Sequence, residues 1–75
     1  MITGAQVRGA RGILKLDQRA LAEKASVSVE TIKRLEKIDG PLLTATGTTL
    51  HAIQTALESV GIEFIEGGVR KRNVE

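Results

Sequence analysis

The first third of the chain shows two helical patterns, each preceded by a residue suited to cap a helix. Residues Thr3 to Gln6 match the capping-box spacing of Thr and Gln, and Val7, Ala10 and Leu14 then recur on one helical face. Asp17 can accept from the free N–H groups of a second, shorter helix. The apolar positions of that helix are Leu21, Ala22 and Ala25. The pattern predicts one helix to about residue 14 and a second that begins after Asp17.

A tight turn and a third helix follow. The segment Ala25-Ser26-Val27 is the predicted turn, and Ser28 is the cap of a helix that extends to about Lys37. At about 100° per residue, Ile32 and Leu35 point to one side of this helix. The opposite side is polar and mostly basic, and it carries Val29, Glu30, Lys33, Arg34 and Lys37.

One more helix is predicted in the second half of the chain. The segment Ile38-Asp39-Gly40-Pro41 ends the third helix, because Pro disfavours helical backbone in the residue before it, and a loop runs to about Ala45. Either Thr46 or Thr48 caps a fourth helix, which Gly61 terminates. Its apolar positions, at helical spacing, are Leu50, Ile53, Leu57 and Val60.

The pattern changes after the fourth helix. Residues Ile62 to Ile65 approach a period of two, and Gly67-Gly68 can turn the chain into a second strand, Val69 to Arg72. Two strands alone are marginally stable in water, so they must pack on a helix or pair with a second subunit. The expected fold class is all-α, with four helices and a short C-terminal β-strand or hairpin.

Composition sets the scale of the fold. The chain has 75 residues, 41% hydrophobic and 27% charged, which suits a single globular domain. With no Cys and only one aromatic residue, Phe64, the core must be aliphatic and has no disulfide to stabilise it. Small domains of this kind often oligomerise, so we expect a homodimer. We divide the chain into residues 1–61, the helical part, and 62–75, a strand or hairpin with a basic tail and a candidate dimerisation element.

Charge is distributed unevenly along the chain. Residues 1–37 carry eight Lys or Arg against four Asp or Glu, a net +4, whereas residues 38–69 carry four acids and no Lys or Arg. Residues 70–75 add +2. This distribution predicts that one face of the protein can bind a polyanion and that another face repels it. No apolar run approaches the roughly 20 residues of a membrane span, and residues 1–3 show no targeting pattern, so we expect a cytoplasmic protein with no membrane partner.

The segment from Asp17 to Lys37 carries the functional prediction. Two short helices joined by a tight turn, the second with an exposed basic side, are typical of a helix-turn-helix. The major groove of DNA is roughly 12 Å wide and admits one helix, whose side chains must reach the base edges. We therefore expect this segment to bind double-stranded DNA.

The same segment resembles the phage-repressor or Cro-like helix-turn-helix proteins, the XRE family. The matching residues form three blocks, Gln18-Arg19-Ala20-Leu21-Ala22, Ala25-Ser26-Val27-Ser28 and Thr31-Ile32-Lys33-Arg34-Leu35-Glu36. They follow the family pattern of Gln at the start of the second helix, a turn of small residues, and Ile-x-x-Leu-Glu in the third. The resemblance covers about residues 3–60 and implies a small transcriptional regulator, a repressor in most such cases.

The resemblance also implies contacts to the DNA backbone. Gln18 matches the residue that binds a phosphate at the positive end of the second helix. Ser28 would touch phosphate as well, although capping alone explains it. Lys37 would contact phosphate or simply face solvent.

Four residues occupy or flank the positions that the family uses to read bases. Arg34 or Lys33 would donate to guanine O6 and N7, and Glu30 would accept from cytosine N4. Val29 would pack against a thymine methyl group. The alternative for Glu30 is a favourable charge near the helix N-terminus.

Two further features come from the resemblance. Arg11 and Glu36 match a partly buried salt bridge that ties the first helix to the third. Ser26 and Lys15 stand where the family often has Gly, so left-handed backbone at either position would carry modest strain. The loop from residue 39 to 45 has no basic residue to supply a phosphate contact.

Other classes of function fit less well. The sequence offers one His, no Cys and no paired carboxylates, so we expect no enzyme, no metal and no cofactor. His51 flanks the apolar side of the fourth helix, and we expect it to be a surface or boundary residue. A protein-interaction module, such as an antitoxin that holds a toxin-like partner through its C-terminal segment, is the alternative. In a DNA-bound homodimer, the two recognition helices should lie roughly 34 Å apart on a near-palindromic site.

Overall fold

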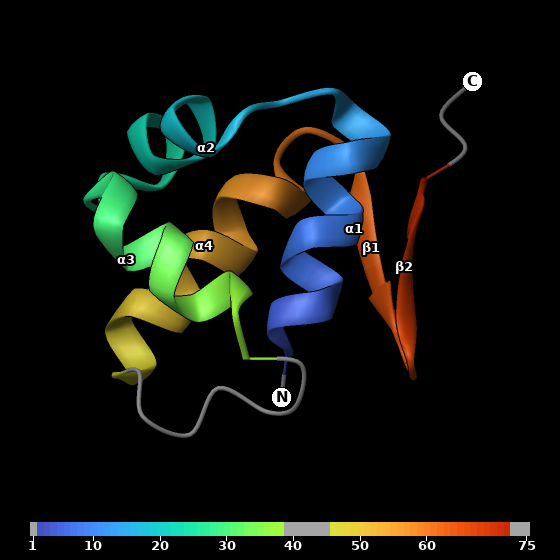
Figure 1. The fold of residues 1–75 in the computed structure, drawn as a ribbon. Coiled ribbons are helices and arrows are strands. Elements are labelled where there is room, and N and C mark those ends of the chain that lie inside the picture. The colour runs from blue at the N-terminus through green and yellow to red at the C-terminus, as the bar shows by residue number, and fades with distance from the viewer. Residues whose placement is uncertain (1, 39–45, 73–75) are drawn as a thin grey trace.

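The computed structural model describes residues 2–38 and 46–72, which form four helices and an antiparallel hairpin (Figure 1). The helices are α1 (Gly4–Leu14), α2 (Gln18–Ala25), α3 (Val29–Glu36) and α4 (Gly47–Glu58), and the strands are β1 (Ile62–Ile65) and β2 (Gly68–Lys71). The predicted fold class, mostly helical with a short C-terminal hairpin, is confirmed. The predicted loop over residues 39–45 lies outside the described residues.

Each helix begins where a side chain accepts from its free N–H groups. Thr3 Oγ1 accepts from the Gln6 backbone N–H at 3.1 Å, and Gln6 Oε1 accepts from the Thr3 N–H at 2.8 Å. The predicted capping box is therefore complete. Asp17, Ser28 and Thr46 cap α2, α3 and α4 in the same way, so the first of the two candidate threonines opens α4.

Both α1 and α2 end on a residue in the left-handed region. Lys15 has φ 58° and Ser26 has φ 57°, and in each case the backbone N–H donates back to carbonyls of the preceding helical turn. These are the two positions at which the resemblance led us to expect Gly. The chain therefore makes the left-handed caps with L residues, which is unfavourable for the backbone.

The end of α4 differs from the prediction. The helix ends at Glu58 instead of continuing to Gly61, so Val60 lies beyond the helix. The N–H groups of Val60 and Gly61 donate to the carbonyls of Leu57 and Glu58, three residues back, which tightens the chain into a turn. Apolar spacing extended the predicted helix because Val60 keeps the period, although its backbone has left it.

The first strand of the hairpin lies at the predicted residues, whereas the second strand is shifted by one residue towards the N-terminus. Its register pairs Ile62 with Lys71, Phe64 with Val69, and Ile65 with Gly68. The connecting residues are therefore Glu66 and Gly67, with Gly67 at φ 77°, and β2 begins at Gly68 instead of Val69. A left-handed residue is common in short hairpin connections, which explains a glycine there.

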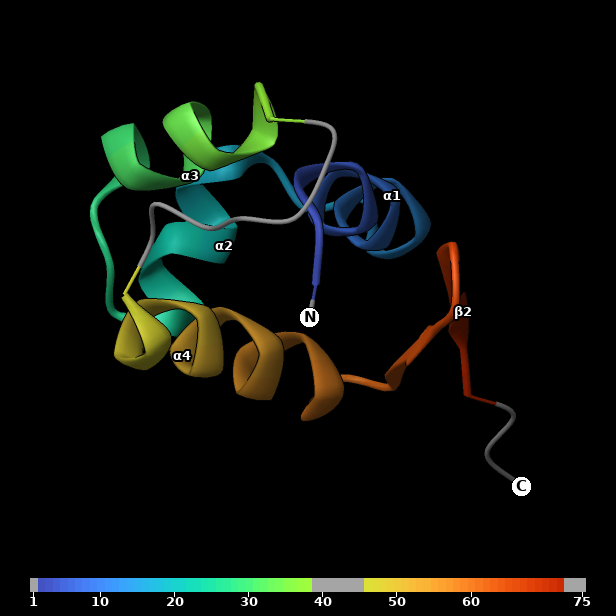
Figure 2. The ribbon, with the colours of Figure 1, turned by 90° about the horizontal axis from the view of Figure 1, so that it is seen from below.

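The core is aliphatic, as expected from the composition. Its largest fully buried side chains come from all four helices and from β1: Val7, Leu21, Ile32, Leu35, Ile53, Leu57 and Ile62. α1 contacts α3 on one side and β2 on the other. Figures 1 and 2 show α2 and α3 at one end of the molecule and the hairpin at the opposite end. We call these the helical end and the hairpin end.

Candidate nucleic-acid interface

α2 and α3 form a compact pair whose inner sides are apolar. Leu21, Ala22 and Ala25 of α2 are buried, as are Ile32 and Leu35 of α3. The turn between the helices is closed by the Val27 N–H, which donates to the carbonyl of Ala22 at 3.0 Å. The two helices pack on each other, and α2 also packs on α4. The α2-turn-α3 unit is thus held in one orientation by the core.

The outer side of α3 is the candidate recognition surface. Glu30, Lys33, Arg34 and Lys37 are all exposed, whereas Val29 is half-buried and packs against the core. Three of the four exposed charges are positive, and their side chains are long enough to reach beyond the helix surface. Of the five residues expected on this side of the helix, four therefore project into solvent and one is partly engaged in packing.

Ser28 is exposed at the start of α3. Its Oγ accepts from the Thr31 backbone N–H at 3.1 Å and lies 2.9 Å from Thr31 Oγ1. Capping therefore uses the hydroxyl in the isolated protein. The hydroxyl remains at the surface, where a phosphate oxygen would have access to it.

Gln18 is turned towards the protein instead of solvent. It is half-buried, and its side-chain Nε2 donates to Glu36 Oε1 at 3.1 Å. The resemblance implied a phosphate ligand at Gln18, and that role does not include this contact. An amide nitrogen carries two hydrogens, so the bond to Glu36 still leaves one N–H for a second acceptor.

Glu36 is the centre of a buried polar cluster. Its side chain is 4% exposed, and Arg11 on α1 approaches it with both Nε, at 2.7 Å from Oε2, and Nη2, at 2.9 Å from Oε1. Arg11 Nη1 also donates to the carbonyl of Leu16 at 2.9 Å. The hydrogen bond that the Arg11 guanidinium donates to Glu36 raises the pKa of Arg11 above its usual value, against an opposing effect of burial. A paired, two-pronged contact of this kind fixes α3 relative to α1 and to the start of α2.

Arg8 belongs to the same corner of the fold, and the sequence reasoning missed it. Its Nη1 donates to the backbone carbonyl of Glu36, near the C-terminal end of α3, where a positive charge is favourable. Arg8 lies three residues before Arg11, so the two side chains share a face of α1. That spacing was the available signal.

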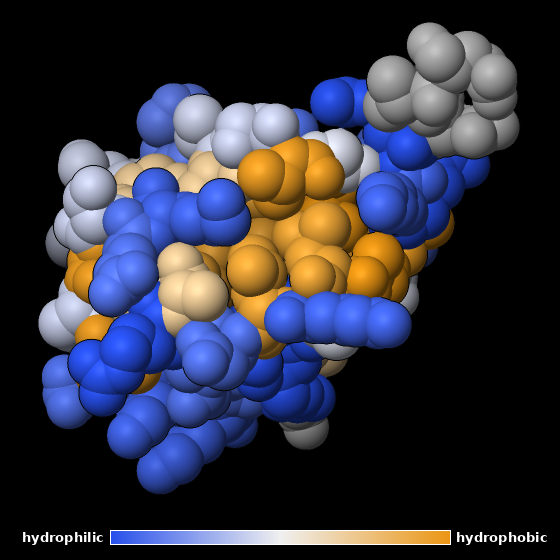
Figure 3. All heavy atoms as spheres, turned by 90° about the horizontal axis from the view of Figure 1, so that it is seen from above, coloured by the Kyte–Doolittle hydropathy of each residue, from blue (hydrophilic) through white to orange (hydrophobic). Residues whose placement is uncertain are grey.

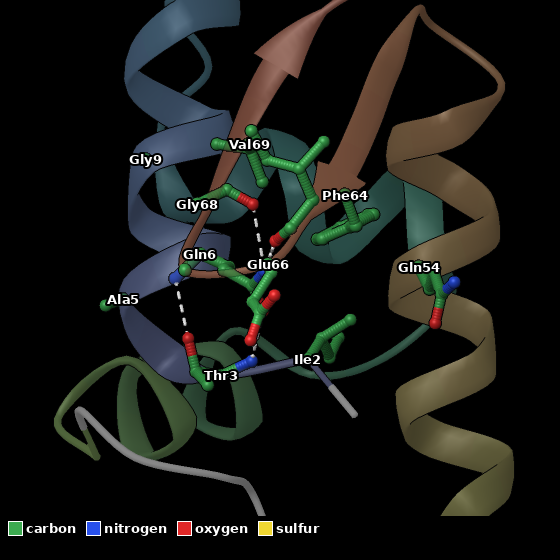
Figure 4. Close-up of a pocket in the computed structure, with 12 residues that line it drawn as sticks. Ile2, Thr3, Ala5, Gln6, Gly9, Gln54, Phe64, Glu66, Gly68 and Val69 are labelled. Atoms are coloured by element: carbon green, nitrogen blue, oxygen red, sulfur yellow. Dashed lines mark hydrogen bonds between the residues drawn. The ribbon is translucent and has the colours of Figure 1, made fainter.

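Gln6 also binds the hairpin, which the capping-box pattern in the sequence did not predict. Its Nε2 donates to the carbonyls of Ile65 and Gly68, each at 2.9 Å, on the two sides of the hairpin turn. Figure 4 shows this amide between α1 and the hairpin, beside a hollow bordered by Ile2, Phe64 and Val69. One buried side chain thus caps α1 and holds the hairpin against it.

A metal site and a membrane-spanning helix would be two other functional features of the described residues. In the part of the chain that the structure describes, no three His, Asp or Glu side chains come together as a metal site requires. His51 is exposed on α4, with Nε2 3.4 Å from Thr55 Oγ1. Across residues 2–38 and 46–72, no helix is long and apolar enough to cross a bilayer.

A comparison with protein-family models finds no match for this chain, and a comparison with curated proteins finds no significant match.

Proposed function

We propose that the protein is a small cytoplasmic transcriptional regulator, most simply a repressor, that binds double-stranded DNA in a sequence-specific manner as a homodimer. In this proposal α3 enters the major groove. The observation that carries it is the two-sided character of α3: Ile32, Leu35 and Glu36 are buried, while the opposite side presents Glu30, Lys33, Arg34 and Lys37. The resemblance of residues 3–60 to XRE-family proteins supports the same conclusion.

The rigidity of α3 favours a role in reading a surface of defined shape. Glu36 is bonded to Arg11 and to Gln18, so both neighbouring helices hold the recognition helix. Side chains that project from a fixed helix can make bidentate contacts with bases, and each good contact of this type is worth about 1–3 kcal/mol of discrimination. Arg34 and Lys33 are the proposed guanine donors, and Glu30 the proposed acceptor from cytosine.

The backbone contacts are assigned to the start of α2 and α3 and to the end of α3. Gln18 would use the amide hydrogen that Glu36 does not engage, and Ser28 its surface hydroxyl. The N-terminal N–H groups of α3, which is capped by the neutral Ser28, add a favourable field for a phosphate. Lys37 would bind phosphate without regard to sequence.

The first experiment is a selection of bound duplexes from a random pool by the full chain, followed by titration at several salt concentrations. We expect one enriched, near-palindromic motif and an affinity that falls linearly with salt on logarithmic axes. Enrichment of no motif, together with absent or salt-independent binding, would contradict the proposal. That outcome would favour the protein-interaction module.

Two variants and a control assign the contacts. Arg34→Ala should cost about 1–3 kcal/mol of binding and relax preference at one base position, whereas Lys37→Ala should weaken all sequences alike and reduce the salt slope by about 1. Arg72→Ala removes an exposed charge at the hairpin end and should leave both the motif and the slope unchanged. Equal effects of all three changes would point to nonspecific attraction instead.

A further inference from the structure

The two faces of the hairpin have different surroundings. Side chains alternate along a strand, so Phe64 and Val69 lie on one face, which packs against the core. Val69 comes so near to α1 that a Cβ added at Gly9 would lie 3.3 Å from Val69 Cγ2. Ile65 points the other way and is 41% exposed. The hairpin therefore has an inner face on α1 and an outer face of four residues, Glu63, Ile65, Gly68 and Arg70.

On the outer face, an acid lies opposite a base and a large apolar side chain lies opposite a glycine. Glu63 and Arg70 are directly opposite each other and form a salt bridge whose side chains are 42% and 65% exposed. Ile65 is directly opposite Gly68, so a large apolar side chain stands next to a position with no side chain. Each row of the face thus pairs a feature on β1 with its complement on β2.

This pattern is self-complementary under a twofold rotation. We propose that a second copy of the chain packs face to face on this surface, with the twofold axis parallel to the strands. Within one copy, each β1 residue is paired with a β2 residue across the hairpin. The twofold axis places the same β1 residue over the second copy's equivalent of that β2 residue. Ile65 then fills the space over the second copy's Gly68, and Glu63 lies over the second copy's Arg70. Both contacts occur twice, as an isologous interface requires.

Pairing of the hairpins edge to edge is disfavoured by charge. The edge of β2 carries Arg70 and Lys71, with Arg72 directly after the strand, and a symmetric pairing of two such edges brings like charges together. The β1 side carries Glu63 and Glu66 and no base. Among twofold-symmetric arrangements, only the face-to-face one sets acid against base.

The position of the surface is compatible with a free recognition helix. Figures 1 and 2 place the hairpin at the end of the molecule away from α2 and α3. Figure 3, seen from above, shows a gathering of apolar side chains on the side of the molecule where α1 ends. Ile13, in the last turn of α1, is 40% exposed. Lys15, two residues further on, is exposed, and no acid of the described chain bonds to it, so that patch lacks the matched charge pair.

The inference specifies the homodimer in the proposed function and does not depend on DNA binding. Sedimentation equilibrium of the full chain without DNA therefore tests it separately. We expect a concentration-dependent dimer that Ile65→Lys and Gly68→Leu each weaken at least about tenfold, because one buries a charge and the other fills the space for Ile65. A Cβ at Gly68 meets nothing within 4 Å, so the second variant should fold normally.

Ile13→Lys is the matched control, since it changes the other exposed isoleucine by the same substitution. It should leave the dimer constant unchanged. A wild-type chain that stays monomeric at millimolar concentration overturns the inference. So does a dimer that Ile13→Lys abolishes and Ile65→Lys leaves intact.

A charge exchange gives the sharper test. Glu63→Arg makes the charged row of the outer face entirely basic, and Arg70→Glu makes it entirely acidic, so each variant alone should associate more weakly than the wild type. An equimolar mixture should form a heterodimer, because every basic position of one variant then lies over an acidic position of the other. Circular dichroism checks that both variants are folded. If the mixture associates no better than its components, the face-to-face arrangement is wrong.

Discussion

Among the residues that the structure describes, the helical end and the hairpin end both contain an Arg–Glu salt bridge, and the two bridges have different roles. Arg11 and Glu36 are 22% and 4% exposed and also bond to Leu16 and Gln18. Arg70 and Glu63 are 65% and 42% exposed and bridge two neighbouring strands. The first bridge is surrounded by the fold and fixes three helices, whereas the second remains accessible. Burial, and not the chemistry of the pair, decides whether it acts within the chain or is available to a partner.

The contrast extends to how each end is attached. The helical end has Leu21, Ile32 and Leu35 in the core, so its orientation is set by several fully buried side chains. The hairpin end is attached by Ile62, by the half-buried Phe64 and Val69, and by the amide of Gln6. We therefore expect the hairpin to open at a lower free energy than the α2-turn-α3 unit.

The largest effect should come from removing the buried acid. Glu36→Ala leaves the Arg11 guanidinium without its partner and should lower the free energy of unfolding by about 3–5 kcal/mol. The control at the hairpin end is Glu63→Ala, whose exposed pair is worth about 0–1 kcal/mol. Urea denaturation of both variants measures the difference. Similar losses in the two variants would contradict the distinction between the bridges.

A methyl group at the start of α1 should disturb the helical end almost as strongly. A Cβ at Gly4 would overlap the backbone carbonyl oxygens of Leu35 and Ile38, so Gly4→Ala must push α1 away from the end of α3. We expect a loss of about 3 kcal/mol, at the upper part of the range for overpacking. Gly12→Ala, on the same helix, meets nothing within 4 Å and should stabilise by up to about 1 kcal/mol. A neutral Gly4→Ala would show that the two helices are not in close contact.

At the hairpin end, removing the Gln6 amide should cause a smaller loss of stability, confined to the hairpin. Gln6→Ala leaves the carbonyls of Ile65 and Gly68 without this donor and should cost about 2 kcal/mol. Amide hydrogen exchange should show faster exchange in β1 and β2 than in α2 and α3. Gln54→Ala removes an amide whose one partner among residues 2–38 and 46–72 is Glu58 on its own helix, and should change stability by no more than about 0.5 kcal/mol. Uniform acceleration across the whole chain would mean that Gln6 supports the global fold instead.

The sequence predicted what is local and missed what is not. The caps at Thr3, Asp17 and Ser28 are read from neighbouring residues, and the structure confirms them. The bond from Gln6 to the hairpin joins residues about sixty positions apart, and no periodic pattern carries that information. The early end of α4 was missed for a related reason: Val60 keeps the apolar spacing, while its backbone hydrogen bond has already changed.

The candidate site divides in the same way. The exposed side of α3 could be predicted, because helical geometry alone sets Lys33 and Arg34 opposite Ile32 and Leu35. The bond between Gln18 and Glu36 could not, since it depends on how α2 crosses α3. The partner of Glu36 on α1 came from the resemblance and not from spacing.

The smallest expected change in stability comes from the residues with left-handed backbone, for which the two ends use different residue types. The helical end uses Ser26 at φ 57°, and the hairpin end uses Gly67 at φ 77°. Ser26→Gly relieves an unfavourable backbone conformation of about 1 kcal/mol or more, but the greater freedom of Gly in the unfolded chain offsets part of this gain. We expect a net stabilisation of about 0.5 kcal/mol by thermal denaturation. Gly67→Ala makes the opposite change and should destabilise by about 1 kcal/mol. If Ser26→Gly destabilises instead, the Ser26 side chain must contribute more to the turn than its exposed position suggests.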